Sequence, residues 1–529
     1  MTTVTPYRSR VVPGRDGFRQ LLRAEWVKFR SVRGWVIGMV VAVLAIVVLG
    51  AGPGRSGSCG THGAASDCTQ LLGPGGEAVT DSFYFVHQAL DGNGSITVEM
   101  TSLTGQLPVL SGGGTPGPAQ AGDGPSTRPG LVPWAKAGII IKASTRAGSA
   151  YAAMMVTGGH GVRMQYDYTG DAPGLAGSVT AASPRWLRLS RSGDTLTGYD
   201  SADGTHWARV GSAVLAGLPA AVQGGLFATS PQYFQTSLGV AALNSGGSQA
   251  TGVFDHLGLL GAWPGGRWAG TAIGAPGGPA AGSPGGFQDA AGRFTVTGTG
   301  DIAPSVSGAS GLGVTIAQTL IGVFAGLFAV VVVATMFMTA EYRRGLIRVT
   351  LAAAPRRGRV LAAKAVVVGA AAFAAGLAGA AIAVIAGQRV LRGNGVYVWP
   401  VTALTEVRVI VGTAAVLAVA AVIALAIGTA VRRSAAAVAA VIVVIVVPYL
   451  LTVAVPVLPA GPAEWMARVT PAAAFAVQQT LIQYPQVSNV YVPSAGYYPL
   501  SPWAGFAVLC AWAALALALA AWLLRRRDA

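Results

Sequence analysis

The chain has 529 residues, of which 52% are hydrophobic and only 11% are charged, less than half the charged share of about 25% in ordinary soluble domains. Together with a mean hydropathy of +0.54, this composition argues against a wholly soluble globular protein. The formal net charge is nevertheless +16, so nucleic-acid binding can be judged only from where the positive charge lies.

The first element is a basic segment, residues 1–33, whose second half predicts an amphipathic helix. At helical spacing over residues 17–33, apolar side chains fall on one face and arginines on another. Such a helix can lie in a membrane interface with its charged side chains among the lipid phosphates. A simple basic flank of a membrane span would also explain the arginines, but it would not need Glu25 among the apolar residues.

Six apolar stretches stand out along the chain, and none contains Asp, Glu, Lys, Arg or His. Each is long enough to cross a hydrocarbon core of about 30 Å as a helix, and six of them are hard to explain as buried helices of a soluble core. We therefore predict six membrane spans, at residues 34–52, 312–340, 365–387, 409–431, 435–458 and 503–524. Pro448 and Pro456 are expected to kink or end the fifth span.

Positive charge is concentrated in segments that would share one side of the membrane. Residues 1–33, the loop 341–364, the pair 432–433 and the tail 525–529 together hold 20 basic and 4 acidic residues. The positive-inside rule makes this side cytoplasmic, so both termini are expected in the cytoplasm of a multi-pass cell-membrane protein. The segments expected outside are 53–311, 388–408 and 459–502. The charge therefore marks topology, and no nucleic-acid partner is expected.

The long segment between the first two spans, residues 53–311, has the composition of a secreted β-domain. Its run from Trp186 to Val210 predicts three short strands joined by turns rich in Gly, Ser and Asp. Further strands are predicted at 82–88, 95–100, 138–143, 151–156, 161–168, 224–228 and 252–258. Many strands at short spacing indicate an extracellular all-β sandwich, or jelly roll, inserted into an α-helical membrane bundle.

Cys59 and Cys68 lie in this outer part, where an oxidising environment favours a local disulfide. Two free thiols are the alternative. The five histidines show no metal-ligand spacing, so no metal site is predicted. No pair of carboxylates can be singled out for glycan hydrolysis, and no catalytic residue is predicted.

The loop between spans two and three, residues 341–364, predicts a second short amphipathic helix. Glu341, Arg344 and Arg348 would share one face at helical spacing, while an apolar stripe that begins at Ile347 would share another. Anchoring by a basic loop explains the arginines. It does not explain the glutamate or the ordered apolar stripe.

The chain has no nucleotide-binding motif of its own. None of its four lysines lies in a G-x-x-x-x-G-K-[ST] phosphate loop. The predicted spans also lack the acidic and histidine side chains that mark ion-coupled carriers. Energy for transport would therefore have to come from outside the membrane part.

Three sequence stretches, Leu22–Arg33, Thr339–Lys364 and Thr470–Thr480, carry a likeness to a known family. With them, residues 17–50 and 312–527 resemble ABC-2 type permeases of the actinobacterial drug-efflux kind. The resemblance implies a separate ABC ATP-binding subunit that holds ATP and Mg²⁺, and two six-span halves joined as a homodimer or heterodimer. The residues it implies for coupling to the ATPase are Glu25, Lys28, Arg30, Glu341, Tyr342, Arg343, Arg344, Gly345, Arg348, Arg356, Arg357 and Arg359.

The run Trp186–Val210 and the stretch Ala137–Lys142 carry a second likeness. Residues 77–260 resemble concanavalin A-like sandwiches of the lectin and laminin-G kind, which makes a cell-wall glycan a candidate partner. The segment Phe294–Ile302 is similar to the opening strand of such domains, although it comes last here. We expect it to fold back beside residues 81–88 and to bring both domain ends near the membrane.

These observations favour the transmembrane permease subunit of an ATP-driven ABC-2 type exporter. A membrane-anchored, cell-surface glycan-binding protein or sensor is the alternative, although one span would suffice to anchor it. An anchored glycan hydrolase is a third reading, and it would need an acid pair in the outer domain.

Overall fold

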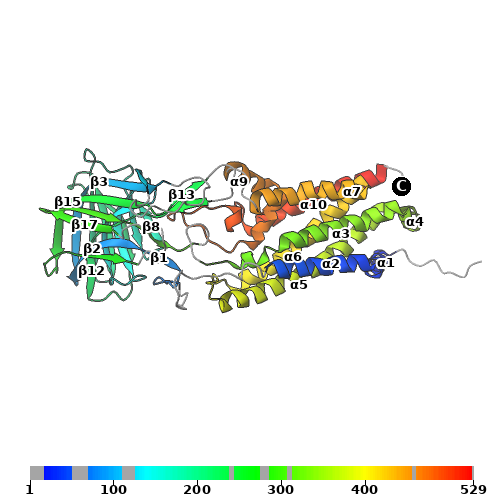
Figure 1. The fold of residues 1–529 in the computed structure, drawn as a ribbon, viewed down its shortest axis with the longest axis horizontal. Helices are drawn as coiled ribbons and strands as arrows, with labels where there is room; N and C mark the ends of the chain where they lie inside the picture. The colour runs from blue at the N-terminus through cyan, green and yellow to red at the C-terminus, as the bar shows by residue number, and fades with distance from the viewer. Residues whose placement is uncertain are drawn as a thin grey trace, which may run out of the picture.

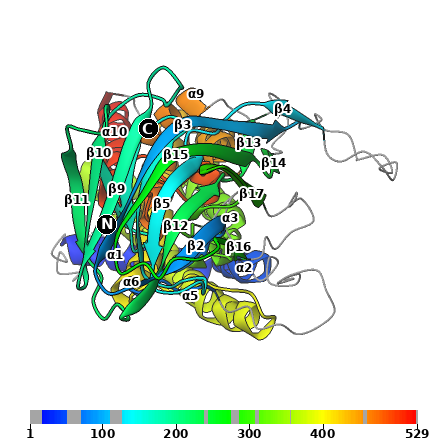
Figure 2. The same ribbon diagram turned by 90° about the vertical axis from the view of Figure 1, so that its left-hand side faces the viewer.

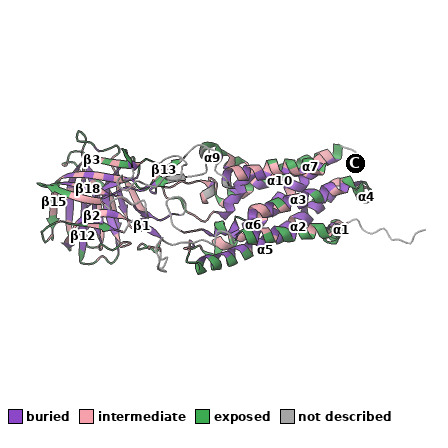
Figure 3. Ribbon diagram, in the orientation of Figure 1, coloured by how far each residue is buried: buried purple, intermediate pink, exposed green. Residues whose placement is uncertain are grey.

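The structure is a computed structural model that describes residues 17–50, 70–109, 126–236, 243–274, 285–306, 313–354, 356–454 and 460–526. The molecule is elongated, with a β-domain at one end and a bundle of helices at the other (Figure 1). Buried residues follow the middle of both parts (Figure 3). Cys59 and Cys68 lie outside the described residues, so their disulfide stays a prediction, and Pro456 lies outside them too.

Six helical stretches are long and apolar enough to cross a membrane, at 33–50, 316–343, 357–393, 403–431, 434–452 and 502–526. They lie where the apolar sequence predicts the six spans. The helices of the bundle are α1 (Phe18–Ser31), α2 (Arg33–Gly50), α3 (Val323–Arg343), α4 (Leu346–Ala353), α5 (Arg357–Gly393), α6 (Ala403–Val431), α7 (Ser434–Val441), α8 (Val447–Tyr449), α9 (Ala460–Val469) and α10 (Pro502–Arg526).

Several helices run beyond the charge-free stretches that predict them. Helix α3 continues through Glu341, and α5 begins early enough to include Lys364. At its other end α5 also includes Arg389 and Arg392, which the sequence places in a loop. The helix continues because no glycine or proline interrupts it there until Gly393. Charged side chains therefore lie on the ends of the membrane helices themselves.

The fifth span is irregular around Pro448, as predicted. Helix α7 is followed by π-helical turns at Ile442–Val446 and Leu450–Ala454, on either side of the short α8. Proline has no backbone N–H and its ring clashes with the preceding turn, so the regular hydrogen-bond ladder is broken there.

Small residues let the third and fourth spans approach closely. A Cβ added at Gly376 on α5 would lie 2.9 Å from Leu417 Cδ1 and 3.0 Å from the Cα of Ala414 on α6. At Gly379 the same addition would meet Ile46 of α2 at 2.9 Å. Glycine on these faces therefore permits backbone packing that a larger side chain would prevent.

The β-domain, which faces the viewer in Figure 2, contains two large sheets. One has eight strands, in the order β11-β10-β9-β3-β15-β18-β17 with β4 beside β3, and the other has seven, in the order β16-β2-β12-β5-β6-β7-β8. Both contribute side chains to one apolar core. The principal strands are β2 (Phe83–Asp91), β3 (Gly94–Pro108), β5 (Lys136–Lys142), β6 (Tyr151–Thr157), β7 (Val162–Tyr166), β9 (Arg185–Ser192), β10 (Thr195–Ser201), β11 (Ala208–Val214), β12 (Ala221–Thr229), β15 (Gln249–Gly261) and β18 (Arg293–Gly298).

Shorter strands complete the sheets or form separate ribbons. They are β1 (Val79–Asp81), β4 (Thr127–Pro129), β8 (Gly170–Pro173), β13 (Tyr233–Thr236), β14 (Leu243–Gly246), β16 (Ala269–Ile273), β17 (Gly285–Ala290) and β19 (Ile302–Pro304). The strands predicted from the sequence are all present. The three predicted between Trp186 and Val210 form the antiparallel meander β9-β10-β11.

The pairing expected for residues 294–302 is wrong for most of that segment. Strand β18 pairs with β15 and β17 in the eight-stranded sheet, whereas β2 belongs to the other sheet. Phe294 and Val296 are buried in the common core, and that burial fixes the strand in its sheet. Only β19 returns to the start of the domain, where Ile302 is paired with Asp81 of β1. This short ribbon brings the two ends of the domain together.

Two buried lysines at the ends of β5 hold this ribbon. Lys142 Nζ lies 2.7 Å from Asp81 Oδ2, and Lys136 Nζ lies 2.7 Å from Asp301 Oδ1. Burial lowers the pKa of Lys142, and the charge of Asp81 opposes that shift. The hydroxyl of Tyr168 also donates to Asp81, at 2.8 Å. Each end of the domain is thus tied to the middle of the seven-stranded sheet by a paired charge.

Replacing Asp81 by alanine should destabilise the β-domain strongly, because Lys142 would be left buried without its carboxylate. Breaking one partner of a buried pair costs about 3–5 kcal/mol. Thermal unfolding of the full-length protein measures the loss. Asp91→Ala is a matched control, since Asp91 is exposed at the end of β2. Equal unfolding temperatures for the two variants would contradict the anchoring role.

Candidate functional site: a buried charge cluster at one end of the bundle

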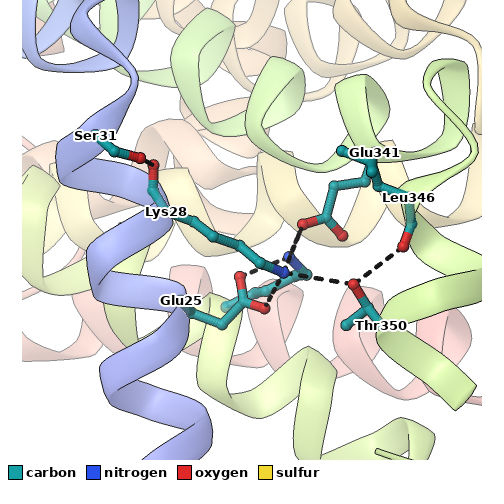
Figure 4. Close-up of polar contacts among 7 residues, drawn as sticks. Glu25, Lys28, Ser31, Glu341, Leu346 and Thr350 are labelled. Carbon is teal, nitrogen blue, oxygen red and sulfur yellow. Dashed lines mark hydrogen bonds and ion pairs between the residues drawn. The ribbon is translucent and has the colours of Figure 1, made fainter. Parts of the chain in front are cut away.

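Four charged side chains from three helices meet at the end of the bundle opposite the β-domain (Figures 1 and 4). Lys364 Nζ lies 2.7 Å from Glu25 Oε2 and 2.7 Å from Glu341 Oε1. Lys28 Nζ lies 3.0 Å from Glu25 Oε1 and 3.3 Å from Glu341 Oε1. Each lysine therefore bridges both glutamates. We call Glu25, Lys28, Glu341 and Lys364 the charge cluster.

The charge cluster is buried and electrically balanced. The side chain of Lys364 is fully buried, and the side chains of Glu25 and Glu341 are 1% and 7% exposed. An unpaired charge in such a place would be very costly, and the mutual attraction of two positive and two negative groups offsets much of that cost. Lys28 is the outermost member, at 42% exposure. Burial disfavours its charged form, but its hydrogen bonds and ion pairs with the two glutamates outweigh this and raise the pKa of Lys28.

The local sequence explains how the three helices supply these groups. Glu25 and Lys28 lie one turn apart on α1 and so share a face. Glu341 lies near the end of α3, and Lys364 lies two turns into α5. Helices α1 and α5 are far apart along the chain. The charge cluster therefore joins the segment before the first span to the third span.

Aromatic rings enclose the charge cluster on its membrane side. Phe337 of α3 lies 5.7 Å from Phe29 and 4.9 Å from Trp35, measured between ring centroids. Lys364 Nζ lies 4.9 Å from the centroid of the Phe337 ring, which is within the range of a cation–π attraction. The rings exclude water, so the ion pairs are screened little.

A hydrogen bond connects the charge cluster to the next element, α4. Lys28 Nζ donates to Thr350 Oγ1 at 3.4 Å, and Thr350 in turn donates to the carbonyl of Leu346 (Figure 4). Ile347 on the same helix is buried in the apolar core of the bundle. One side of α4 is therefore attached to the bundle.

The single helix expected from Glu341 onward is wrong. Helix α3 ends at Arg343, and Gly345 adopts a left-handed conformation, with φ of +68°, before α4 begins. Glycine tolerates this backbone without strain, so the chain turns there. Glu341 consequently points into the bundle, while Arg344 and Arg348 lie on exposed positions outside the helix that carries Glu341.

The twelve residues predicted for coupling fall into three groups in the structure. Glu25, Lys28 and Glu341 meet in the charge cluster. Arg30, Arg343, Arg344, Gly345 and Arg348 are exposed, and Tyr342 is half-buried with Arg432 over its ring at 5.2 Å. Arg356, Arg357 and Arg359 lie at the start of α5, where Arg357 Nη1 donates to the carbonyl of Leu524 at the end of α10, at 2.5 Å. Only the first group belongs to the charge cluster.

Sequence reasoning missed Lys364, the central member of the cluster. It lies at the edge of an apolar stretch, where a basic residue reads as a topology signal. The composition could have indicated a special role for Lys364. Lysine is rare in this chain, and three other basic residues at 356–359 already mark the membrane boundary.

No set of three or more His, Cys, Asp or Glu side chains that could hold a metal ion occurs in the described part of the chain. The geometry of the charge cluster suits a mechanical role. It can hold three helices in one arrangement, and it would resist any movement that separates opposite charges in a dry environment.

Replacing Lys364 by methionine should destabilise the helical bundle by about 3–5 kcal/mol, because two buried glutamates would share one half-exposed lysine. Thermal unfolding of the full-length protein in lipid nanodiscs measures the effect. Arg23→Ala is the control, since this side chain is exposed on α1 and surface changes usually stay within about 0.5 kcal/mol. A Lys364→Met protein as stable as the control would show that the cluster does not hold the helices.

The family comparison covers most of the chain. A family model described as ABC-2 family transporter protein matches residues 136–529, which include five of the six spans, α4 and much of the β-domain. Comparison with curated proteins gave no significant match.

Solved structures give only distant likenesses. A functionally unknown protein from Saccharomyces cerevisiae matches at 14% identity, with 34% of this chain and 74% of that chain covered and a TM-score of 0.20. Scytalido-glutamic peptidase with a peptide-based transition state analog matches at 7% identity, with 41% of this chain and 98% of that chain covered and a TM-score of 0.21. Scores this low carry no argument about fold or activity.

Proposed function

Since the chain belongs to the ABC-2 transporter family, we propose that it is the membrane permease subunit of an ATP-driven exporter, coupled to a separate nucleotide-binding subunit. Permeases of this family are transport components and generally work with an ATP-binding subunit. The sequence contains no phosphate-binding loop, which supports assigning ATP and Mg²⁺ to that partner. The observation that carries the proposal is the family match over spans two to six.

The end of the bundle that carries α1 and α4 would face the cytoplasm. This end also holds the C-terminal end of α10 (Figure 1). The basic segments of the sequence gather there, and the positive-inside rule favours the cytoplasm for them. The β-domain would then lie outside the cell, beyond the other end of the spans.

The ATPase would dock on the exposed side of α4 and on the neighbouring α1. Arg343, Arg344 and Arg348 are exposed there, whereas Ile347 and Thr350 attach the other side of α4 to the bundle. A push on α4 would reach the charge cluster through Thr350 and Lys28. Because the four charges must stay paired in a buried site, α1, α3 and α5 would move together. In this proposal the spans then tilt between inward and outward access.

A second permease half would complete the pathway, as a homodimer or heterodimer. The β-domain would cover or guide the exit, and a cell-wall glycan is a candidate ligand for it. A hollow beside the β15–β18 pairing favours a ligand role, since Asp255, Asp289 and Arg293 line it together with Trp268. Such a mixture of polar groups and an aromatic face is typical of ligand sites. A surface glycan-binding protein remains the second candidate function on this observation.

Co-purification tests the main proposal. The native full-length protein, isolated from its membrane in mild detergent, should carry a P-loop ATPase that mass spectrometry can identify. The double variant Arg344→Ala/Arg348→Ala should recover at least tenfold less of it, because two charges of the docking face are lost, while membrane insertion stays unchanged. Arg209→Ala, exposed on β11, is the control and should recover the full amount.

Two results would contradict this. Consistent absence of an ATPase from the native protein would favour the surface-receptor function. Full recovery of the ATPase with the double variant would show that the ATPase does not dock on α4.

A further inference from the structure

We propose that an anionic lipid binds, through its phosphate, in a basic pocket where the start of α5 meets the end of α10. The pocket is lined by Arg356, Arg357, Gly358 and Arg359 of the first helix and by Arg525 of the second. All its charged lining residues are arginines. We call this the arginine pocket, and none of its lining residues belongs to the charge cluster or to α4.

The arginine pocket is open and large enough for a lipid headgroup, with a volume of about 540 Å³. Its two walls are held together by a hydrogen bond from Arg357 Nη1 to the carbonyl of Leu524, at 2.5 Å. The two helix ends are therefore fixed relative to each other before any ligand arrives, which lowers the cost of binding.

The arginine pocket carries positive charge that no described carboxylate balances. Within the described part of the chain, Arg356, Arg359 and Arg525 form no ion pair. The charge cluster, in contrast, balances two lysines with two glutamates. Guanidinium groups match the geometry of phosphate oxygens and bind them through paired hydrogen bonds. Several of them converging on one hollow would attract a phosphate strongly.

The depth of the arginine pocket fits the lipid headgroups. Its residues lie in the first turn of one membrane-spanning helix and the last turn of another. One helical turn rises about 5.4 Å, and each headgroup layer is about 5–8 Å thick. Arg525 directly follows the predicted span 503–524, so the α10 wall of the pocket lies at the depth of the lipid phosphates. Basic pockets between membrane helices are a known way to hold anionic headgroups.

The outer face of α10 offers a place for the acyl chains of the same lipid. Leu515, Leu519 and Trp522 are 64%, 51% and 47% exposed, and at helical spacing they form one stripe along the helix whose last turn contains Arg525. Arg526 lies over the ring of Trp522, 4.4 Å from its centroid. An aromatic ring and a snorkelling arginine at the end of an apolar stripe are typical of the membrane interface. The stripe and the pocket together favour a lipid over a soluble anion.

The lipid also fits this site better than an acidic protein surface does. Protein docking requires a face that reaches beyond the headgroups, and the exposed Arg348 of α4 and Arg344 just before it are proposed for that purpose. The arginine pocket adjoins helix turns that enter the membrane. The inference depends on the chain spanning a membrane, and it stands whether or not an ATPase is the partner.

Native mass spectrometry of the purified full-length protein tests the proposal. The probe is phosphatidylglycerol, titrated against phosphatidylcholine at equal concentration. The wild-type protein should hold phosphatidylglycerol at least tenfold more tightly than phosphatidylcholine. The triple variant Arg356→Gln/Arg359→Gln/Arg525→Gln should lose that preference. A matched triple variant on the exposed face of α1, Arg19→Gln/Arg23→Gln/Arg30→Gln, should keep it within about threefold, which separates a pocket from general surface charge.

Three outcomes would overturn the inference. The first is equal loss of the preference in both triple variants, which would indicate diffuse charge. The second is displacement of the lipid by inorganic phosphate at the same concentration, which would indicate a site for free phosphate. The third is loss of the ATPase, with the lipid preference intact, in the pocket variant. The single variant Arg525→Gln, outside α5, should weaken binding in the same direction and guards against misfolding of the triple variant.

Discussion

The interaction on which the structure depends is the pairing of buried lysines with carboxylates. The chain has four lysines, Lys28, Lys136, Lys142 and Lys364, and every one of them forms an ion pair with a glutamate or aspartate. Three of the four side chains are fully buried. Arginine supplies the remaining basic residues, many of them exposed at the end of the helices. Every lysine in this protein connects elements, whereas many of the arginines at the end of the helices face the surroundings.

Such pairs specify an arrangement more than they stabilise it. The attraction between two buried charges is largely offset by the loss of their hydration, so an apolar replacement of the whole pair can be nearly neutral. Separating the partners is what costs free energy. In the β-domain, the two pairs fix the incoming and outgoing segments to β5. In the bundle, the charge cluster fixes α1 to α3 and α5. Pairing of a buried lysine with a carboxylate thus fixes both ends of the β-domain, and it also fixes the end of the bundle that lies farthest from the β-domain.

The sequence allowed much of the architecture to be predicted, because the bilayer and the β-pleat impose regular patterns. Spans follow from uninterrupted apolar stretches, and the meander from Trp186 to Val210 follows from alternation and turn residues. Strand order could not be predicted, since pairing depends on which buried faces meet; Phe294 was therefore assigned to the wrong neighbour. The break at Gly345 was missed because a glycine inside a periodic stretch is compatible with a continuing helix.

The sequence alone predicted only part of the candidate site. The positions of Glu25 and Glu341 indicated a specific role, because acidic residues are unusual in basic membrane-flanking segments. Both lie in the charge cluster. Lys364 did not, because a lysine beside an apolar stretch has an ordinary explanation as a topology signal. The sequence alone could not show that α1 and α5, which are more than 300 residues apart along the chain, pack against each other. The arginine pocket was likewise hidden, since Arg525 and Arg356 are far apart along the chain.

The central claim is that the charge cluster makes α1 and α5 act as one unit. A double-mutant cycle on Glu25→Gln and Lys364→Met tests it most directly, with unfolding free energy measured in nanodiscs and ATP hydrolysis measured in the assembled transporter. The double variant should be more stable than the sum of the two single effects implies, by at least about 1 kcal/mol, and each single variant should lower transport-linked hydrolysis. Additive effects on stability, with hydrolysis unchanged in all three variants, would contradict it.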